Sequence, residues 1–428
     1  MKNIITLLVT CGVATLPAAA QTGRDAFDAR FENKALRLDF VHAGDREGEE
    51  IFFDEAREEP HWGGPVRDLV DTTFCGNYYV HLRDLRTGEL LYSRGFCTLF
   101  GEWRGTDEAR SLRRAAPGTV RVPYPRADAL VEILARDAGG EFREKFRHVV
   151  RVNDPFIKRE RVAAYPTRDI HVTGDPTHRV DIVLLPDGYA AGEMEKFVTD
   201  CEAFTRGLFA FAPYSDHAGL FNVRAVLAPS RESGADVPRE GAWKNTLLNT
   251  SFYTLGTERY LMTYDHKALR DLAANVPYDF IYVIVNTGKY GGGAIYNHYG
   301  CGTSGNLLAA KVHVHEFCHL FAGLGDEYAE DGAYNDMYPP GVEPWEANLT
   351  TLVHFEKKWQ DLLDAGTPVP TPLDPARPTR TGVYEGAGYA FKGVYRPRPD
   401  CLMRTLRGDD FCPACTRAIV QQIHRYAE

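Results

Sequence analysis

The sequence has no excess of positive charge, few cysteines and, beyond its first twenty residues, no long apolar run. Its 428 residues include 49 Lys and Arg against 59 Asp and Glu. The resulting net charge of −10 argues against nucleic acid or an anionic membrane surface as the main partner. We expect no membrane span, because no stretch of about 18 apolar residues follows residue 20. Nine cysteines are too few for a disulfide-built scaffold, whereas 44% hydrophobic residues suffice for two or three domain cores.

Residues 1–20 have the pattern of a secretory signal peptide. Lys2 precedes an apolar run, Ile4–Leu16, and small residues follow at Ala18 and Ala20. The apolar run is too short to span a bilayer. We therefore expect cleavage after Ala20 and a secreted or periplasmic mature chain, in a compartment that permits disulfides.

Residues 21–155 carry the signals of strands and hairpins. Apolar and polar residues alternate along Leu36–Phe40, and the alternation returns at Leu130–Leu134 and Phe142–Val152. The turn residues Arg86–Gly88 separate two further strand patterns, as in a β-hairpin. The pattern predicts an antiparallel β-sandwich, or a barrel, as the first domain.

From residue 156 onward, apolar runs alternate with helical patterns. Val180–Leu185 and Phe280–Val285 are runs typical of strands buried on both faces. Between them, helical periodicity appears at Glu193–Phe209 and His266–Ala274. This order predicts a mixed sheet covered by helices. The expected fold class is therefore α+β, with residues 156–428 forming a second domain after the antiparallel one.

The segment His315-Glu316-Phe317-Cys318-His319 has the spacing of a zinc site on a helix. Residues four apart lie on one helical face, so both imidazoles can offer a nitrogen to the same ion. Glu316 is offset by one position, where it can take a proton from a zinc-bound water without being a ligand. Zinc would lower the pKa of that water towards about 7 and polarise the carbonyl under attack.

A catalytic zinc needs a third protein ligand, and the residues after the motif offer two candidates. We expect the helix to end at Gly323, which can adopt the left-handed conformation that reverses the chain. Asp326 is favoured because its offset from the glycine matches that of the third ligand in metzincin-type sites, and Glu327 is the alternative. The competing interpretation is an ordinary amphipathic helix over Lys311–Ala322 that happens to carry two histidines.

The stretch His315–Tyr328, HEFCHLFAGLGDEY, resembles the signature of the M64 peptidase family, named for an IgA-cleaving metallopeptidase. In that signature H-E-F-G-H precedes an A-G-L-x-D-E-Y segment. Further segments resemble the same family: Leu36–Gly44, Tyr92–Ala109, Asp181–Tyr189, Pro229–Pro238, Tyr290–Asn297, Glu343–Thr350, Tyr395–Met403 and Phe411–Cys415. The resemblance covers most of the mature chain. It implies a secreted zinc metallopeptidase, with a metzincin-like catalytic domain at 156–428 behind an amino-terminal β domain.

Three features near the motif have two interpretations each. Cys318 stands where the family signature has glycine, and we expect a small buried hydrophobe there rather than a ligand. Met403 is either the methionine that forms an apolar floor under the metal in metzincin-like folds or an ordinary core residue. The glycine-rich segment Tyr290–Asn297 is either an edge onto which substrate adds as a strand or a flexible loop.

Cys401, Cys412 and Cys415 resemble the tail of archaemetzincins, where clustered cysteines bind a second, structural zinc. The fourth cysteine of that pattern is missing here. In an exported protein we expect instead a disulfide that involves Cys401.

Several tyrosines are candidates to donate a hydrogen bond to the oxyanion of a tetrahedral intermediate. Tyr395, close to Met403, is the first choice. The full set is Tyr328, Tyr334, Tyr384, Tyr389 and Tyr395.

These residues together predict hydrolysis of peptide bonds. His315, His319 and Asp326 would hold Zn²⁺, and Glu316 would activate water and pass its proton to the leaving amine. The expected partner is a protein or peptide substrate, positioned or covered by the amino-terminal domain. Two other functions compete: a zinc amidase or deacetylase acting on cell-wall or glycan material, and a secreted binding protein with a residual metal site. Oligomeric state and cleavage preference stay open.

Overall fold

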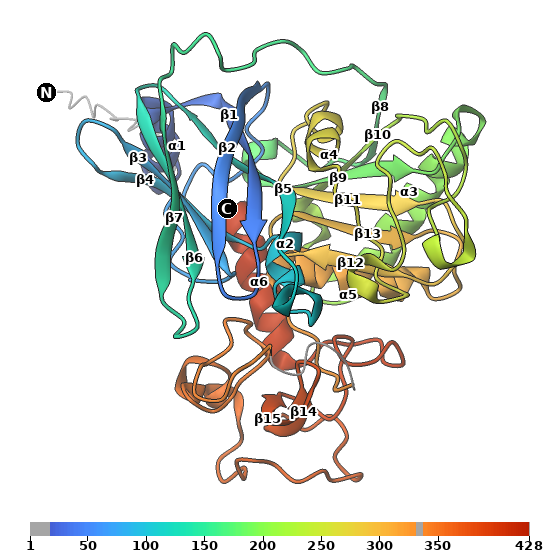
Figure 1. Ribbon diagram of the computed structural model, residues 1–428. Coiled ribbons are helices and arrows are strands. Elements are labelled where there is room, and N and C mark those ends of the chain that lie inside the picture. Colours follow the sequence, from blue (N-terminus) through green and yellow to red (C-terminus); the bar gives the residue numbers. More distant parts are fainter. Residues whose placement is uncertain (1–17, 331–336, 428) are drawn as a thin grey trace, which may run out of the picture.

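The computed structural model describes residues 18–330 and 337–427, which Figure 1 colours from blue to red along the chain. Two sheet-containing parts lie side by side, and a layer of loops lies below them. Most of the predicted signal peptide, residues 1–17, falls outside the described residues. Within the described ranges, no helix is long and apolar enough to cross a membrane.

Two antiparallel sheets form the first part of the chain, after a short helix. Their strand orders are β2-β1-β5 and β4-β3-β6-β7. The elements are α1 (Ala18–Arg30), β1 (Phe31–Gly44), β2 (Glu49–Glu59), β3 (Tyr78–Asp84), β4 (Leu90–Phe96), α2 (Leu99–Trp103), β5 (Arg114–Pro125), β6 (Ala129–Arg136) and β7 (Phe142–Val150). Every second residue of β6 is buried, and its Val131 and Ile133 join Leu36 and Leu38 of β1 in one apolar cluster. The predicted antiparallel strands are confirmed.

A six-stranded mixed sheet forms the second part, with strand order β12-β13-β11-β9-β10-β8. Its four central strands run parallel, and the two edge strands, β12 and β8, are antiparallel to their neighbours. The mixed sheet predicted for this region is therefore confirmed. The elements are β8 (Thr167–His171), β9 (Val180–Asp187), α3 (Met194–Leu208), β10 (Phe221–Val226), α4 (His266–Ala273), β11 (Phe280–Val285), β12 (Gly292–Ile295), β13 (Tyr299–Thr303) and α5 (Ala309–Ala322).

The apolar runs of the central strands are explained by burial on both faces of the sheet. Ile182 and Leu184 of β9 pack into one core with residues of α3 and α5, whereas Val183 and Leu185 pack with residues of α4 on the other face. Because successive side chains of a strand point to opposite faces, a mostly apolar run fits such a doubly covered sheet.

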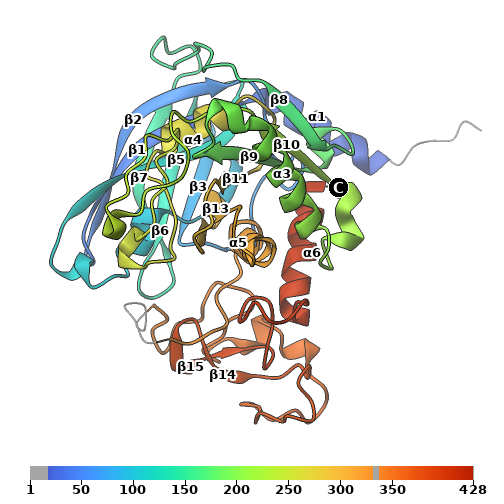
Figure 2. The same cartoon turned by 90° about the vertical axis from the view of Figure 1, so that its right-hand side faces the viewer.

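The third part, between α5 and α6, is mostly loop within the described residues. It also contains a hairpin, β14 (Tyr384–Ala387) and β15 (Ala390–Arg396), which the sequence pattern did not indicate. The last helix, α6 (Pro413–Ala427), runs from this layer back up between the two sheet-containing parts (Figure 1). Figure 2 shows α3, α5 and α6 gathered on one side of the second sheet.

Buried charged groups join the two sheet-containing parts. The Arg121 guanidinium donates to Glu59 Oε2 at 2.7 Å and to the Tyr278 carbonyl at 3.0 Å, and it lies 3.8 Å from the centroid of the Tyr278 ring. The Arg121 and Glu59 side chains are 6% and 1% exposed. Each ion therefore depends on its partner, because water is excluded from both.

Replacement of Glu59 by alanine should strongly destabilise the protein. Removing one partner of a buried pair leaves the other charge uncompensated, at a cost of about 3–5 kcal/mol. The matched control is Glu89→Ala, which removes an exposed ion pair with Arg30 and should cost about 0–1 kcal/mol. Urea denaturation followed by circular dichroism measures both free energies of unfolding. Equal losses in the two variants would contradict the structural role of the Arg121 pair.

Candidate metal centre

Helix α5 presents two histidines to a cavity and its apolar residues to the core. His315 and His319 lie one turn apart, with their Nε2 atoms 3.0 Å from each other. Val314, Phe317 and Phe321 of the same helix pack into the core beneath the second sheet. The amphipathic pattern therefore orients the helix so that the two imidazoles face outward together.

A left-handed turn follows α5 and returns the chain to the histidines. Gly323 has φ of 59° and ψ of 35°, and its N–H donates to the His319 carbonyl. Asp326, three residues on, lies with Oδ1 3.1 Å from His315 Nε2 and 3.4 Å from His319 Nε2. A residue with a Cβ would resist this turn, both because φ is positive and because Trp345 and Tyr296 lie against that side of the glycine.

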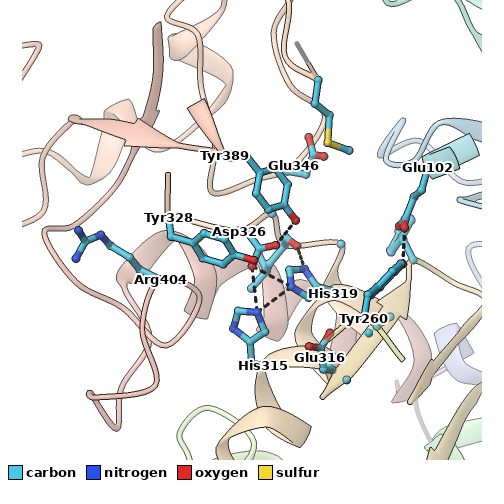
Figure 3. A pocket seen from close by; sticks show the side chains of 18 of the residues that line it. Glu102, Tyr260, His315, Glu316, His319, Asp326, Tyr328, Glu346, Tyr389 and Arg404 are labelled. Carbon is cyan, nitrogen blue, oxygen red and sulfur yellow. Dashed lines mark hydrogen bonds and ion pairs between the residues drawn. The ribbon is translucent and has the colours of Figure 1, made fainter. Parts of the chain in front are cut away.

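Hydrogen bonds hold each candidate ligand in orientation. Nδ1 of His315 lies 3.0 Å from the Leu402 carbonyl, and Nδ1 of His319 lies 2.5 Å from the Leu324 carbonyl. Carbonyls only accept, so both Nδ1 atoms carry a proton, and both Nε2 atoms lie against Asp326 Oδ1, where a metal ion could take the place of any proton they carry. The Tyr389 hydroxyl donates to Asp326 Oδ2 (Figure 3). Two imidazole nitrogens and one carboxylate oxygen, all within 4.8 Å of one another, form a donor set that suits zinc.

Burial and mutual attraction shift the protonation of these groups. Burial by itself would raise the pKa of Asp326, but the two histidines hold it well below its ordinary value. Burial by itself would lower the pKa of His319, but the Asp326 carboxylate raises it to about 9. Burial raises the pKa of Glu316, opposed by the charges of His315 and His319. The Asp326 carboxylate therefore favours positive charge at the two histidines, whether from bound protons or from a metal ion.

All three parts of the chain line one cavity of about 530 Å³ around this centre. Glu316 lies in the same space as the two histidines (Figure 3). The first part contributes Asn77, Cys97 and Glu102. The second contributes β12, α5 and the turn that follows it, and the third contributes residues around Tyr389 and Leu402.

Sequence patterns missed several residues of the cavity wall. Tyr260 donates a hydrogen bond to Glu102, although 158 positions separate them in the chain. Burial raises the pKa of Glu102 to about 7. Arg259 donates to the Tyr328 hydroxyl at 3.2 Å and pairs with Glu330. Arg259, Tyr260 and Glu330 belong to no periodic segment or motif. Glu102 lies in the family-like segment Tyr92–Ala109, but that segment gave it no role, so no local signal marked these residues.

The candidate tyrosines separate into two groups. Tyr328 and Tyr389 line the cavity. Tyr395, the first choice from sequence, is not part of the lining: it lies in β15, and its backbone pairs with Thr350 in an isolated bridge. Tyr384 pairs with Arg396 across the same hairpin and does not line the cavity either. Tyr334 lies outside the described residues.

The other singled-out features lie close to the centre. Cys318 is fully buried, with Sγ 3.4 Å from the Tyr214 hydroxyl, on a different side of α5 from the cavity. Met403 is fully buried in the core, and its carbonyl accepts from the Glu327 N–H at 2.8 Å. The glycine-rich segment forms the sheet's edge strand β12, with Gly293 packed so closely on Tyr260 that a Cβ would collide.

Glu327, the alternative third ligand, lies among cysteines, and Cys401 lacks the expected disulfide. Glu327 points away from the histidines, with Oε1 3.2 Å from Cys415 Sγ. The disulfide predicted for Cys401 is wrong: Cys75, Cys97, Cys201, Cys301, Cys318, Cys401, Cys412 and Cys415 are all free thiols. Sγ of Cys401 lies 3.9 Å from Cys415 Sγ, well beyond the disulfide bond length of about 2.05 Å.

Comparison with protein families finds two matches that together span most of the chain. Residues 169–381 and 373–423 match the family model described as IgA Peptidase M64. Residues 26–147 match the model described as Peptidase M64 N-terminus. No curated protein matches the sequence.

Replacement of Gly323 by alanine should destabilise the protein more than the same change at a comparable glycine. Both Gly323 and Gly241 are left-handed, so either substitution imposes a backbone cost of about 1–2 kcal/mol. At Gly323 the new methyl group would also lie 2.6 Å from the Trp345 ring, whereas nothing lies within 4 Å at Gly241. We expect an additional loss of about 1–3 kcal/mol at Gly323, measured by urea denaturation. A similar loss in both variants would show that Trp345 does not constrain the turn.

Proposed function

This chain belongs to the M64 peptidase family, and we propose that it hydrolyses peptide bonds with zinc bound by His315, His319 and Asp326. The family assignment implies a peptidase acting on peptide substrates. The zinc ion, its ligands and the role of Glu316 are the further content of the proposal.

One observation carries the zinc assignment: the orientation of the three donor atoms. Both histidine Nε2 atoms and Asp326 Oδ1 converge, while backbone carbonyls hold the two Nδ1 protons on the opposite side of each ring. Metal-binding histidines are held in this way, with the second nitrogen donating to a carbonyl or carboxylate. Three protein ligands leave a coordination position open, as catalytic zinc requires. The α5 helix, the glycine turn and the returning carboxylate support a metzincin-like arrangement.

The chain's own residues would carry out the proton transfers. Bound zinc would lower the pKa of a coordinated water to about 7 and polarise the scissile carbonyl. Glu316, buried beside the two histidines, would accept a proton from the attacking water and deliver it to the leaving amine. Its raised pKa suits both transfers, because a group that must gain and lose a proton works best with a pKa near the working pH.

Hydrogen-bond donors in the cavity wall would stabilise the developing oxyanion. Tyr328 and Tyr389 are the candidates because both line the cavity. Tyr389 already donates to Asp326, so its hydroxyl orients a proposed ligand. Tyr328 has its hydroxyl held by Arg259, which makes it the better placed donor.

Substrate would lie between the amino-terminal sheets and the loops of the third part. Asn77, Cys97 and Glu102 of the first part line the same cavity as the proposed zinc ligands. We propose that the first part positions substrate rather than only covering the site. Along β12, the Gly292 carbonyl accepts from Leu261 N–H and the Tyr296 carbonyl from Cys97 N–H, so an added strand would have to pair between these two points.

Export of the chain is a further part of the proposal. It is supported by the pattern of residues 1–20 alone, with cleavage after Ala20.

Replacement of Glu316 by glutamine should abolish peptidase activity while zinc stays bound. Loss of a general base lowers kcat/KM by about 10²–10⁴-fold, and the amide cannot take up the proton. The control is Glu195→Gln on the exposed face of α3, which should keep full activity. Profiling of a mixed peptide library, with metal analysis of the same samples, measures both effects. The peptidase proposal would be overturned if the zinc-loaded parent protein cut no peptide but released acetate or ammonia from glycan amides. The activity would then be that of an amidase or deacetylase.

One substitution at the proposed third ligand, and one at the tyrosine that donates to it, should weaken zinc binding to different degrees. Tyr389→Phe removes only the hydroxyl that donates to Asp326, so zinc affinity should fall about 10–100-fold. Asp326→Ala removes the ligand and should lower the affinity further, with loss of activity. Competition with a chromophoric chelator gives the affinities. Unchanged zinc affinity in Asp326→Ala would remove Asp326 from the ligand set.

A further inference from the structure

A second group of side chains that could hold a metal ion lies close to the first, since Glu327 follows Asp326 in the chain. Glu327, Cys401, Cys412 and Cys415 each offer one ligand atom, and these four atoms lie within 4.8 Å of one another. All four residues are at most 1% exposed, and none of them lines the cavity. They come from three separate segments: the turn after α5, the loop after β15, and the start of α6.

We propose that these four residues bind a second zinc ion, which has a structural role. Tetrahedral zinc with bonds of about 2.0–2.3 Å places its ligand atoms about 3.3–3.8 Å apart. Glu327 Oε1 lies 3.2 Å from Cys415 Sγ and 3.8 Å from Cys412 Sγ, and Cys401 Sγ lies 3.9 Å from Cys415 Sγ. Four protein ligands complete the coordination shell, as in structural rather than catalytic sites.

The Glu327 carboxylate is the independent evidence that a cation belongs here. Its Oε1 accepts from the Asn348 amide at 3.0 Å, but its Oε2 is buried without a hydrogen-bond partner. A buried carboxylate with an unpaired oxygen is costly unless a cation compensates it. Thiols donate weakly, so the three cysteines as thiols would not meet that need. A zinc ion bound by all four side chains would compensate the charge of the carboxylate.

Backbone N–H groups point at two of the three sulfur atoms, as they do at metal-bound thiolates. The backbone N–H of Cys412 points at Cys401 Sγ, 3.3 Å away, and that of Cys415 points at Cys412 Sγ, 3.4 Å away. Cys412 directly precedes α6 and Cys415 lies in its first turn, where the helix dipole favours negative charge. Three thiolates make a soft donor set that selects zinc over Ca²⁺ or Mg²⁺. The carboxylate takes the place of the fourth cysteine that the sequence lacks.

The second site would hold the first site's ligands in place. Glu327 directly follows Asp326, so fixing one carboxylate fixes the backbone that carries the other. The segment after Cys401 contacts both sites: the Leu402 carbonyl lies against His315 Nδ1, and the Met403 carbonyl accepts from the Glu327 N–H. A zinc ion there would tie α6 and this segment to the turn after α5.

Metal analysis of the intact protein and a double variant tests the second site. The parent protein should hold two equivalents of zinc, and His315→Ala/His319→Ala should keep one. X-ray absorption at the zinc edge of the double variant should show three sulfur neighbours at about 2.3 Å and one oxygen. A double variant without zinc, or with no sulfur neighbours, would overturn the proposal.

Variants of the four residues, made in the His315→Ala/His319→Ala background, assign the ligands. Cys412→Ser and Glu327→Gln should each lose most of the remaining equivalent. Cys201→Ala, a buried cysteine of α3 outside the group, should keep it. Retention of zinc by Glu327→Gln and Cys412→Ser alike would refute the assignment. If either variant fails to fold, the X-ray absorption spectrum of His315→Ala/His319→Ala itself still shows whether sulfur atoms bind the remaining zinc.

Thiol state separates this proposal from the disulfide alternative. Mass spectrometry of the unreduced, denatured parent should find Cys401, Cys412 and Cys415 all reduced after zinc release. A disulfide between any two of them would overturn the second site. Either result is independent of peptidase activity. If the protein cleaves no peptide but holds sulfur-bound zinc, the proposed function fails and the second site stands.

Discussion

The contact of one buried carboxylate with two imidazoles orders the surroundings of the cavity. Asp326 Oδ1 lies between His315 and His319, which is possible only because the chain reverses at Gly323. A carboxylate so deeply buried requires positive charge nearby, from protonated histidines or from a metal ion. The carbonyls behind the rings and the Tyr389 hydroxyl are arranged around that requirement.

The consecutive acidic residues Asp326 and Glu327 contact different groups of side chains. Asp326 turns to the histidines and Glu327 to the thiols of Cys412 and Cys415. The carbonyl of Leu402 orients a histidine, and the next carbonyl holds the Glu327 backbone. The two proposed zinc ions would therefore be linked by two short segments, Asp326–Glu327 and Leu402–Met403. Loss of order at one metal site would disturb the ligands of the other.

The amino-terminal sheets are part of the cavity rather than an attachment to it. Glu102 accepts from Tyr260 across the boundary, and Asn77 accepts from the Trp345 indole at 3.0 Å. Trp345 in turn packs against the turn at Gly323. The first part thus reaches, through two contacts, the turn that positions Asp326. The boundary at residue 155 stays a prediction. The main apolar cluster of the first part contains no residue of the second sheet, but Cys97 and Leu99 pack into the cluster on one face of that sheet.

The sequence by itself determined the features that depend on neighbours a few positions away. Period-two alternation predicted the antiparallel strands, the apolar runs predicted β9 and β11, and the helical spacing placed His315 and His319 on one face. Only the tertiary structure decided which carboxylate meets the histidines, which tyrosines line the cavity and what surrounds Cys401. These contacts join residues such as Glu327 and Cys412, 85 positions apart, or Tyr260 and Glu102, 158 apart. Local periodicity carries no record of them, because they arise from how the sheets, loops and α6 pack together.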